Sequence, residues 1–231
     1  MKMIGIIGGI APESTIDYYR RLLAGYRERR LDGSQPAVII NSIDLQKMLG
    51  LIGAGQLEEV TDYLVAEVER LARAGAEVGA LASNTPHIVF DAIARRSPIP
   101  LVSIVEAACA RAKSLRLKRL GLFGTRFTMQ GRFYPEAFAC EGLAIVAPTA
   151  EELDFVHDKY INELAAAKFL PQTRESLLEI AARMKARDGI DALILGGTEL
   201  PLLLTDNSPV GVPFLDTTEI HVEAILEKAL G

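Results

Sequence analysis

The sequence predicts an α/β protein built from two similar lobes. Short apolar runs alternate with long segments of helical periodicity, the pattern that gives parallel sheets covered by helices. The run KMIGIIG at residues 2–8 is echoed 116 residues later by KRLGLFG at 118–124, and VGALASNTPH at 78–87 is echoed about 114 residues later by DALILGGTEL at 191–200. Two echoes at nearly one offset indicate a duplication, for which we expect a pseudo-twofold relation between the lobes.

The expected elements follow from these patterns in chain order. Strands are predicted where short apolar runs are bounded by turn residues: Met3 to Gly8, Ala37 to Ser42, Val78 to Ala82, Leu101 to Ser103, Arg119 to Gly124, Ala144 to Ala147, Ala192 to Leu195 and Val212 to Leu215. Helices are predicted over Glu13 to Arg30, Leu57 to Ala74, Glu106 to Leu115, Arg174 to Arg187 and Glu219 to Leu230. We expect the last strand and helix to complete the first lobe, so the predicted domains are 1–105 with 212–231, and 106–211.

Composition limits the class of partner and the compartment. The net charge of -5 and the pI near 5.4 disfavour a nucleic-acid partner, which needs a basic face. The apolar run MKMIGIIGGIAP is too short for a membrane span and too glycine-rich for a signal segment, so a cytoplasmic protein without a membrane partner is expected. Cys109 and Cys140 lie in helix-like stretches without metal-ligand spacing, and His87, His157 and His221 are too scattered in sequence to suggest a metal.

Four glycine- and hydroxyl-rich turns follow predicted strands. Ligands of parallel sheets bind beyond the carboxyl ends of the strands, where helix N-termini offer unpaired N–H groups that suit carboxylates. Helix capping alone remains the alternative explanation at each turn. Neither GxGxxG nor the Walker lysine is present, so dinucleotide and P-loop sites are excluded. The turns are Gly8 to Thr15, Ser83 to Pro86, Gly124 to Thr128 and Gly196 to Pro201.

The motifs IGIIGGIAPESTIDYY, SNTPH, LGLFGTRFTMQGRFY and GGTEL resemble those of the aspartate/glutamate racemase superfamily. Within it they are similar to the cofactor-independent aspartate racemases and the broad-specificity amino-acid racemases, over nearly the whole chain. The resemblance implies two flavodoxin-like lobes with parallel sheets, an active site in the cleft between the lobes, no pyridoxal phosphate and a homodimer.

The chain departs from this family at the catalytic positions. The resemblance implies one cysteine in each catalytic turn, but Ser83 and Gly197 stand at those places, and Cys109 and Cys140 match neither and are expected to be packing residues. A serine hydroxyl is far more basic than a thiol with a pKa of about 8.5, so Ser83 needs an activator. Gly197 has no side chain, which leaves water, Thr198 or Glu199 to move a proton there. A symmetric two-thiol mechanism is excluded.

The other site residues come from motif position. The resemblance implies that the substrate's α-carboxylate is held by hydroxyl and backbone donors, with Ile10 packed near it, and that Lys168 lies near the substrate. Either Lys168 or Lys47 could pair with a distal carboxylate. His87, four residues after Ser83, could share a helix face with it, or act only in packing. The candidate binding residues are Ile10, Asn84, Thr85, Thr125, Thr128, Thr198, Glu199 and Lys168.

Two functions are compatible with these residues. The first is an amino-acid racemase-like isomerase that acts without a cofactor at the Cα of an acidic or related amino acid. The alternative is a catalytically degenerate protein of the same fold that binds an amino acid or another carboxylate. In both cases the expected partner is a small-molecule amino acid or dicarboxylate.

Overall fold

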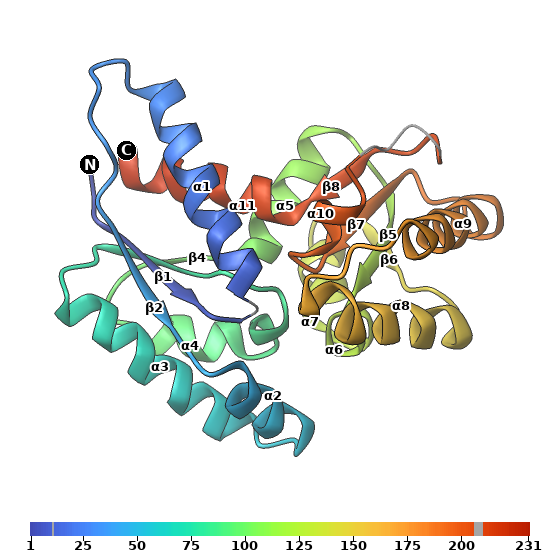
Figure 1. Ribbon diagram of the computed structural model, residues 1–231, viewed down its shortest axis with the longest axis horizontal. Coiled ribbons are helices and arrows are strands. Elements are labelled where there is room, and N and C mark those ends of the chain that lie inside the picture. Colours follow the sequence, from blue (N-terminus) through green and yellow to red (C-terminus); the bar gives the residue numbers. More distant parts are fainter. Residues whose placement is uncertain (11, 206–209) are drawn as a thin grey trace. The chain divides into compact units, whose positions relative to one another are not determined.

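The computed structural model describes residues 1–10, 12–205 and 210–231, and it divides into two compact units. The first unit comprises Met1–Ile104 with His221–Gly231, and the second comprises Val105–Ile220. Each unit contains a four-stranded parallel sheet flanked by helices (Figure 1). The predicted α/β class with two similar parallel-sheet lobes is therefore confirmed.

The elements of the first unit alternate between strand and helix as the sequence predicts. They are β1 (Ile4–Gly8), α1 (Pro12–Arg29), β2 (Val38–Ser42), α2 (Leu45–Gly53), α3 (Leu57–Arg73), β3 (Val78–Leu81), the 3-10 helix η1 (Thr85–Val89), α4 (Phe90–Arg96) and β4 (Leu101–Val102). The helix α11 (Thr217–Leu230) begins in the second unit and contributes the rest of its length to the first.

The second unit repeats this alternation. Its elements are α5 (Ile104–Ser114, from its second residue), β5 (Arg119–Gly124), α6 (Arg126–Gln130), α7 (Phe133–Ala139), β6 (Ala144–Val146), α8 (Ala150–Asn162), η2 (Leu164–Ala166), α9 (Pro171–Asp188), β7 (Ala192–Gly196), α10 (Leu200–Leu203) and β8 (Phe214–Asp216).

The two sheets share one topology. The strand order is β2-β1-β3-β4 in the first and β6-β5-β7-β8 in the second, and every pairing is parallel. The sequence echoes lie on equivalent central strands, because the first pair falls on β1 and β5 and the second on β3 and β7. The repeat seen in the sequence is thus a repeat of fold.

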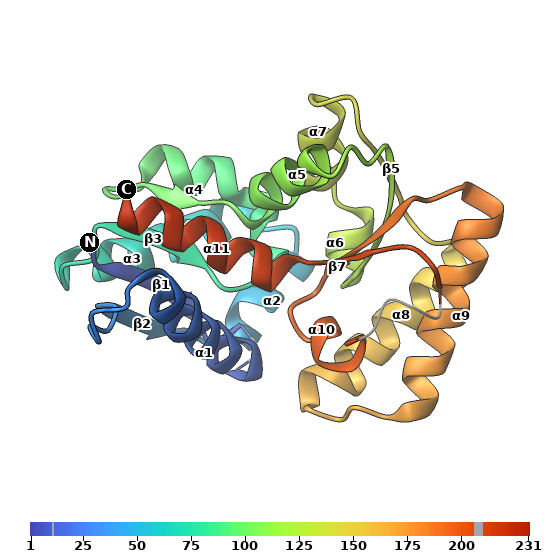
Figure 2. The same ribbon diagram turned by 90° about the horizontal axis from the view of Figure 1, so that it is seen from above.

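The core of the first unit follows from the two-residue period of its strands. Ile4 and Ile6 of β1 point to the side covered by α1 and α11, which lie side by side (Figures 1 and 2). Gly5 points to the opposite side, where an added Cβ would lie 2.8 Å from the Ala76 Cβ and 3.1 Å from the Leu71 Cδ1. Glycine at this position lets the end of α3 pack closely against the strand.

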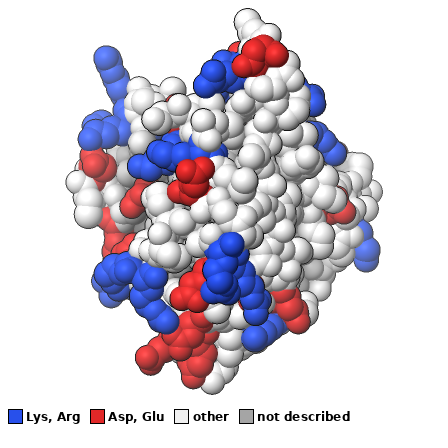
Figure 3. Space-filling model, turned by 90° about the vertical axis from the view of Figure 1, so that its left-hand side faces the viewer, with Lys and Arg blue, Asp and Glu red and all other residues white. Residues whose placement is uncertain are grey.

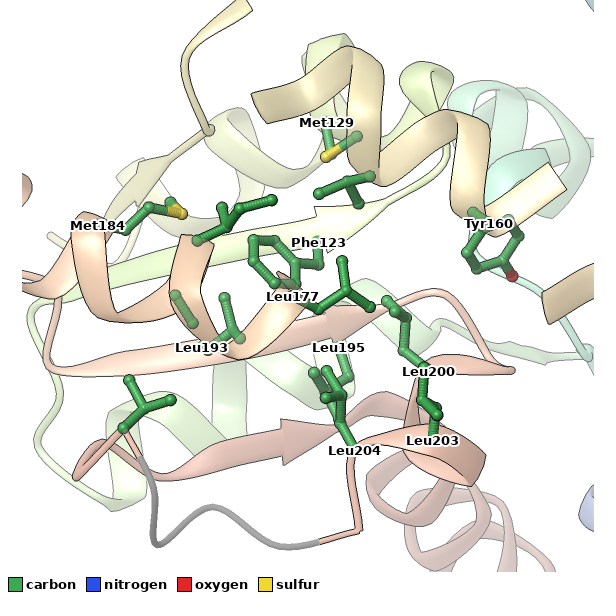
Figure 4. Close-up of a cluster of buried hydrophobic side chains, with 14 of the residues drawn as sticks. Phe123, Met129, Tyr160, Leu177, Met184, Leu193, Leu195, Leu200, Leu203 and Leu204 are labelled. Atoms are coloured by element: carbon green, nitrogen blue, oxygen red, sulfur yellow. The ribbon is translucent and has the colours of Figure 1, made fainter. Parts of the chain in front are cut away.

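The core of the second unit lies between β5, β7 and the helices α8 and α9. Figure 4 shows Phe123 and Leu195 from the two central strands packed among Leu177 and Met184 of α9, with Tyr160 of α8 at the edge of the cluster. All of these side chains are buried. The carboxyl end of β7, where the second candidate turn begins, therefore rests on a packed apolar base.

One expected feature of the organisation is wrong. The predicted strand at Val212 to Leu215 was expected to complete the first lobe, but β8 pairs with β7 in the second sheet, with Ile194 opposite Leu215. Only the chain from His221 onward belongs to the first unit, where Val222, Ile225 and Leu226 of α11 pack in its core. Parallel pairing with β7 holds β8 in the second sheet, whereas the apolar face of the following helix, α11, packs in the core of the first unit.

Several helices lie outside the five ranges predicted from periodicity, namely α2, α4, α6, α7, α8 and α10. Most are short, and short helices carry too few apolar repeats to be recognised by periodicity. The 13-residue α8 is different, because its start carries a capping box in which Thr149 and Glu152 bond each other's backbone N–H groups. The sequence TAEE at 149–152 is the signal that identifies this helix.

Surface charge in the structure is mixed. On the face shown in Figure 3, lysine and arginine side chains lie among aspartate and glutamate side chains around a broad area without charged residues. This face does not carry the continuous basic surface that nucleic acid requires. Among the described residues, no helix combines the length and the apolar character needed to cross a membrane.

Candidate functional site

The four candidate turns lie at equivalent places in the two sheets. The strand order reverses between β1 and β3, and again between β5 and β7. In open parallel sheets, ligands bind beyond the carboxyl ends of the strands at such a reversal point. The turns after β1 and β3 are thus brought together in the first unit, and the turns after β5 and β7 in the second.

The turn after β1 is held in a tight backbone conformation. Gly9 has a φ of +79°, and its N–H donates to the Thr15 hydroxyl oxygen at 2.9 Å. A Cβ on Gly9 would lie 2.5 Å from the carbonyl oxygen of Ile43, so no larger residue fits without a backbone shift. Ile10 is buried as expected, and Ala11 lies outside the described residues. The turn leads directly into α1 at Pro12.

The turn after β3 holds Ser83 by its backbone. The Ser83 N–H donates to the Leu81 carbonyl at 2.8 Å, and the Ser83 carbonyl lies 3.0 Å from Nδ1 of His87. Ser83, Asn84 and Thr85 are all buried. Among the described residues, no side chain is hydrogen-bonded to the Ser83 hydroxyl as a base. The structure thus fixes the position of Ser83 without activating its hydroxyl.

His87 serves the backbone of this turn. The N–H of Ile104 donates to His87 Nε2 at 3.2 Å, so Nε2 carries no proton and the hydrogen sits on Nδ1, which donates to the Ser83 carbonyl. Burial, reinforced by the neighbouring His221, lowers the pKa of His87 to about 3. The ring is neutral with both nitrogens engaged. His87 therefore positions the Ser83 backbone, and burial is the main reason that its ring stays neutral.

His221 supports His87 from α11, a relation that the sequence spacing does not reveal. The centroids of the His87 and His221 rings are 6.4 Å apart. The third histidine, His157, lies in the second unit, where its Nδ1 accepts from the Arg126 N–H at 3.1 Å. His221 Nδ1 lies 2.8 Å from the Tyr18 hydroxyl, and its Nε2 lies 2.9 Å from the Val102 carbonyl. Burial lowers the pKa of His221 to about 4.

These two histidines predict a loss of stability in mild acid. The folded protein keeps both rings neutral down to about pH 4, whereas in the unfolded chain each ring binds a proton below its ordinary pKa of 6.5. The unfolded state therefore gains protons as the pH falls from 7 to 5, and each histidine should lower the free energy of unfolding by about 2 kcal/mol. Urea unfolding at the two pH values measures the difference.

The control for this prediction is His221→Gln, which removes one titrating ring. Its pH-dependent loss should be smaller than that of the wild type by about 2 kcal/mol, whatever its stability at pH 7. Equal losses in the two proteins would contradict the assignment of a neutral buried His221.

The turn after β5 is built around two threonines. Thr125 is the N-cap of α6, where its hydroxyl accepts from the Thr128 N–H at 3.3 Å and lies 3.2 Å from the Thr128 hydroxyl. Both side chains are buried. Gly124 pairs with Gly196 of β7, and a Cβ on Gly124 would lie 2.6 Å from the Gly196 carbonyl. Thr125 therefore caps α6, and the close packing of β5 against β7 brings Thr128 next to Gly196.

The turn after β7 has no room for a side chain at position 197. A Cβ on Gly197 would lie 2.2 Å from Cε2, 2.9 Å from Cζ and 3.0 Å from the hydroxyl oxygen of Tyr160. The ring of Tyr160, a residue of α8, thus occupies the space that a side chain at position 197 would take. Glycine at this position and tyrosine at position 160 fit one another.

Tyr160, Thr198 and Glu199 form a buried hydroxyl–carboxylate cluster at this turn. The Tyr160 hydroxyl donates a hydrogen bond to Glu199 Oε2, and the Thr198 hydroxyl donates to the same oxygen at 3.2 Å. Glu199 is fully buried, and its Oε1 has no partner among the described residues. Burial raises the pKa of Glu199, and burial together with the adjacent Glu199 raises the pKa of Tyr160.

The remaining candidates belong to segments other than these four turns. Lys168 is exposed in the segment between η2 and α9. Lys47 lies in the first turn of α2 and not in a loop, and its ammonium sits 4.1 Å from the centre of the Tyr63 ring. Cys109 is buried as expected, but Cys140 is exposed at the end of α7, so only Cys109 is a packing residue.

Comparison with known proteins places these features in a family context. The family model described as Asp/Glu/Hydantoin racemase matches residues 7–225. A solved structure of a candidate Asp/Glu racemase from Yersinia pestis is 30% identical, with full coverage of both chains and a TM-score of 0.91. An aspartate racemase homologue from Pyrococcus horikoshii OT3 is 34% identical, again with full coverage of both chains and a TM-score of 0.86.

Several curated relatives are glutamate racemases of greater length. That of Parafrankia sp. (strain EAN1pec) is 30% identical over 157 residues, which cover 65% of this chain and 53% of the relative. The chain thus spans about half the length of the curated relatives it matches.

Proposed function

This chain belongs to the Asp/Glu/Hydantoin racemase family, and we propose that it is an amino-acid racemase that moves a proton at the Cα of an acidic or related amino acid without pyridoxal phosphate. The observation that carries the proposal is the repeated reversal point. In each sheet, the turns that the resemblance identifies follow the two central strands and hold buried hydroxyl side chains, joined by the Asn84 amide in the first unit. Such strand ends suit a carboxylate ligand.

In this proposal the turns after β3 and β7 act on opposite faces of one substrate Cα. Ser83 stands on the first face in place of a thiol, and Thr198, next to Gly197, stands on the second. The α-carboxylate is bound by side chains of three turns, with Ile10 against it. Lys168 pairs with the distal carboxylate of an acidic substrate. The proposed binding residues are Ile10, Asn84, Thr85, Thr125, Thr128, Thr198, Glu199 and Lys168.

The chemistry explains why this racemase should be slow. Inversion at Cα needs a base on one face to remove the α-proton and an acid on the other face to return one. Ser83 is held by backbone hydrogen bonds, and no base activates its hydroxyl. We therefore expect a water molecule at this turn to carry the proton more effectively than the serine. Gly197 removes the second thiol entirely. We therefore expect weaker proton transfer than a pair of thiols would provide.

The test is deuterium exchange at Cα. The protein is incubated in deuterated water with the L- and D-forms of aspartate, glutamate and a panel of other amino acids, and the α-proton signal is followed by NMR. Chiral chromatography of the same samples measures inversion. Loss of the α-proton signal together with appearance of the other enantiomer is the expected result for at least one amino acid.

The degenerate binding protein gives a different outcome in the same experiment. If no amino acid exchanges its α-proton, but one of them raises the melting temperature in proportion to the logarithm of its concentration, the protein binds without turnover and the racemase proposal is wrong. The homodimer and the cytoplasmic location expected from the sequence stay predictions.

A further inference from the structure

We infer that Tyr160 is the proton carrier at the second turn and that Glu199 is the base behind it. This inference rests on the proposed function, because it names the groups that would move the proton on the face where Gly197 has no side chain. Every residue involved lies in the second unit.

Position is the first support. The Tyr160 hydroxyl oxygen lies 3.0 Å from the place where a Cβ of residue 197 would stand, so the phenol occupies the region that a side chain at this position would reach. The three heavy atoms nearest to that Cβ position all belong to the Tyr160 side chain. Because residue 197 is glycine, the Tyr160 phenol on α8 can occupy the space that a side chain at this position would fill.

The hydrogen bonds supply the second support. The Tyr160 hydroxyl donates to Glu199 Oε2, and Thr198 donates to the same oxygen, so the carboxylate is aligned to receive the phenol's proton. The other oxygen, Oε1, is buried without a partner among the described residues, which leaves this carboxylate only partly stabilised. A buried, partly stabilised carboxylate is a stronger base than an exposed one.

The step balances as a relay. The Cα–H bond breaks, its electron pair stays on the substrate as a carbanion next to the α-carboxylate, and the proton passes to the Tyr160 oxygen. At the same time the Tyr160 proton passes to Glu199 Oε2, which becomes a neutral carboxylic acid. The reverse sequence returns a proton to the same face. On the other face, a water molecule at the Ser83 turn gives or takes the second proton.

The deciding variant is Tyr160→Phe, which removes the hydroxyl and keeps the ring that fills the space above Gly197. For the enantiomer whose Cα–H points to the second turn, the α-proton exchange rate should fall on the order of 10²-fold or more. The other enantiomer should still exchange at the Ser83 face, but without inversion. The KM of the Tyr160→Phe variant should stay within a few-fold of the wild-type value. General structural damage does not produce this split between enantiomers.

Two further variants frame the result. Glu199→Gln keeps the size of the side chain and removes the base, so it should give the same enantiomer-specific loss. Tyr134→Phe makes the same change at another buried tyrosine of the second unit and should leave both exchange rates unchanged. Infrared difference spectra between wild type and Glu199→Gln identify the carboxyl band of Glu199, and Tyr160→Phe should shift that band.

The outcomes separate this inference from the proposed function. If the wild type exchanges the α-proton but Tyr160→Phe exchanges both enantiomers at wild-type rates, Tyr160 is not the carrier, while the racemase proposal stands. An unshifted carboxyl band in Tyr160→Phe likewise contradicts the Tyr160–Glu199 relay. If the wild type exchanges no amino acid, the racemase proposal itself is wrong and the relay has no reaction to serve.

Discussion

The triple variant Ser83→Cys/Gly197→Cys/Tyr160→Leu is expected to exchange the α-proton of its amino-acid substrate faster than the wild type, by a factor on the order of 10²–10⁴. A thiol is partly ionised near neutral pH and a serine hydroxyl is not, so the two thiols supply a more effective base and acid than the water at the Ser83 turn and the Tyr160 hydroxyl that they replace. Deuterium exchange followed by NMR, with chiral chromatography for inversion, measures the gain.

The third substitution is required by the packing of Tyr160. A Cβ on Gly197 would meet Cε2, Cζ and the hydroxyl of this residue, and leucine has none of these atoms. With Tyr160 retained, Ser83→Cys/Gly197→Cys should lose about 1–3 kcal/mol of unfolding free energy through overpacking and gain little activity. Gly50→Cys, at a glycine of α2 with no neighbouring atom within 4 Å of an added Cβ, controls for the extra cysteine.

Two results would contradict this account. If the double variant is as stable as the Gly50→Cys control, the ring of Tyr160 does not block position 197. If the triple variant folds, as circular dichroism can show, but remains inert with every amino acid that the wild type binds, the turns after β3 and β7 do not serve one substrate.

Gly9→Ala is expected to cost about 3 kcal/mol or more of unfolding free energy. Two effects add at this position. An alanine at a φ of +79° carries a backbone strain of about 1–2 kcal/mol, and its Cβ would also lie 2.5 Å from the Ile43 carbonyl oxygen. Urea unfolding at pH 7 measures the loss.

Gly33→Ala is the matched control. Gly33 has the same φ of +79°, but no atom lies within 4 Å of its added Cβ. This variant should therefore show the backbone strain alone, and the difference between the two variants measures the close approach of the β1 turn to Ile43. Equal losses would mean that the contact between Gly9 and Ile43 does not constrain this turn.

Much of the candidate site could be predicted from local sequence. The turns after β1, β3, β5 and β7 are marked by glycine, proline and hydroxyl residues directly after apolar runs, and such signals are local because turn conformation depends on a few adjacent residues. The internal echoes then predict that the turns occur in equivalent pairs. The sequence positions of Ser83 and Gly197 follow from the same motifs.

The residues that sequence analysis missed are joined by long-range contacts. Tyr160 and Glu199 are 39 positions apart, and Tyr18 and His221 are 203 apart. No periodicity or spacing rule links such positions, because their contact depends on how α8 and α11 pack against sheets formed elsewhere in the chain. His87 was visible in the sequence, but whether its ring served the Ser83 hydroxyl or the Ser83 backbone was not.

By itself the sequence determined the α/β class, the duplication, the four turns and the absence of cysteine from the turns after β3 and β7, since each of these depends on neighbouring residues. Only the tertiary structure decided that β8 joins the second sheet, that His87 is a neutral support, and that Tyr160 fills the space at Gly197. The physical reason is that hydrogen bonds and close packing act between surfaces, and surfaces exist only once distant segments have come together.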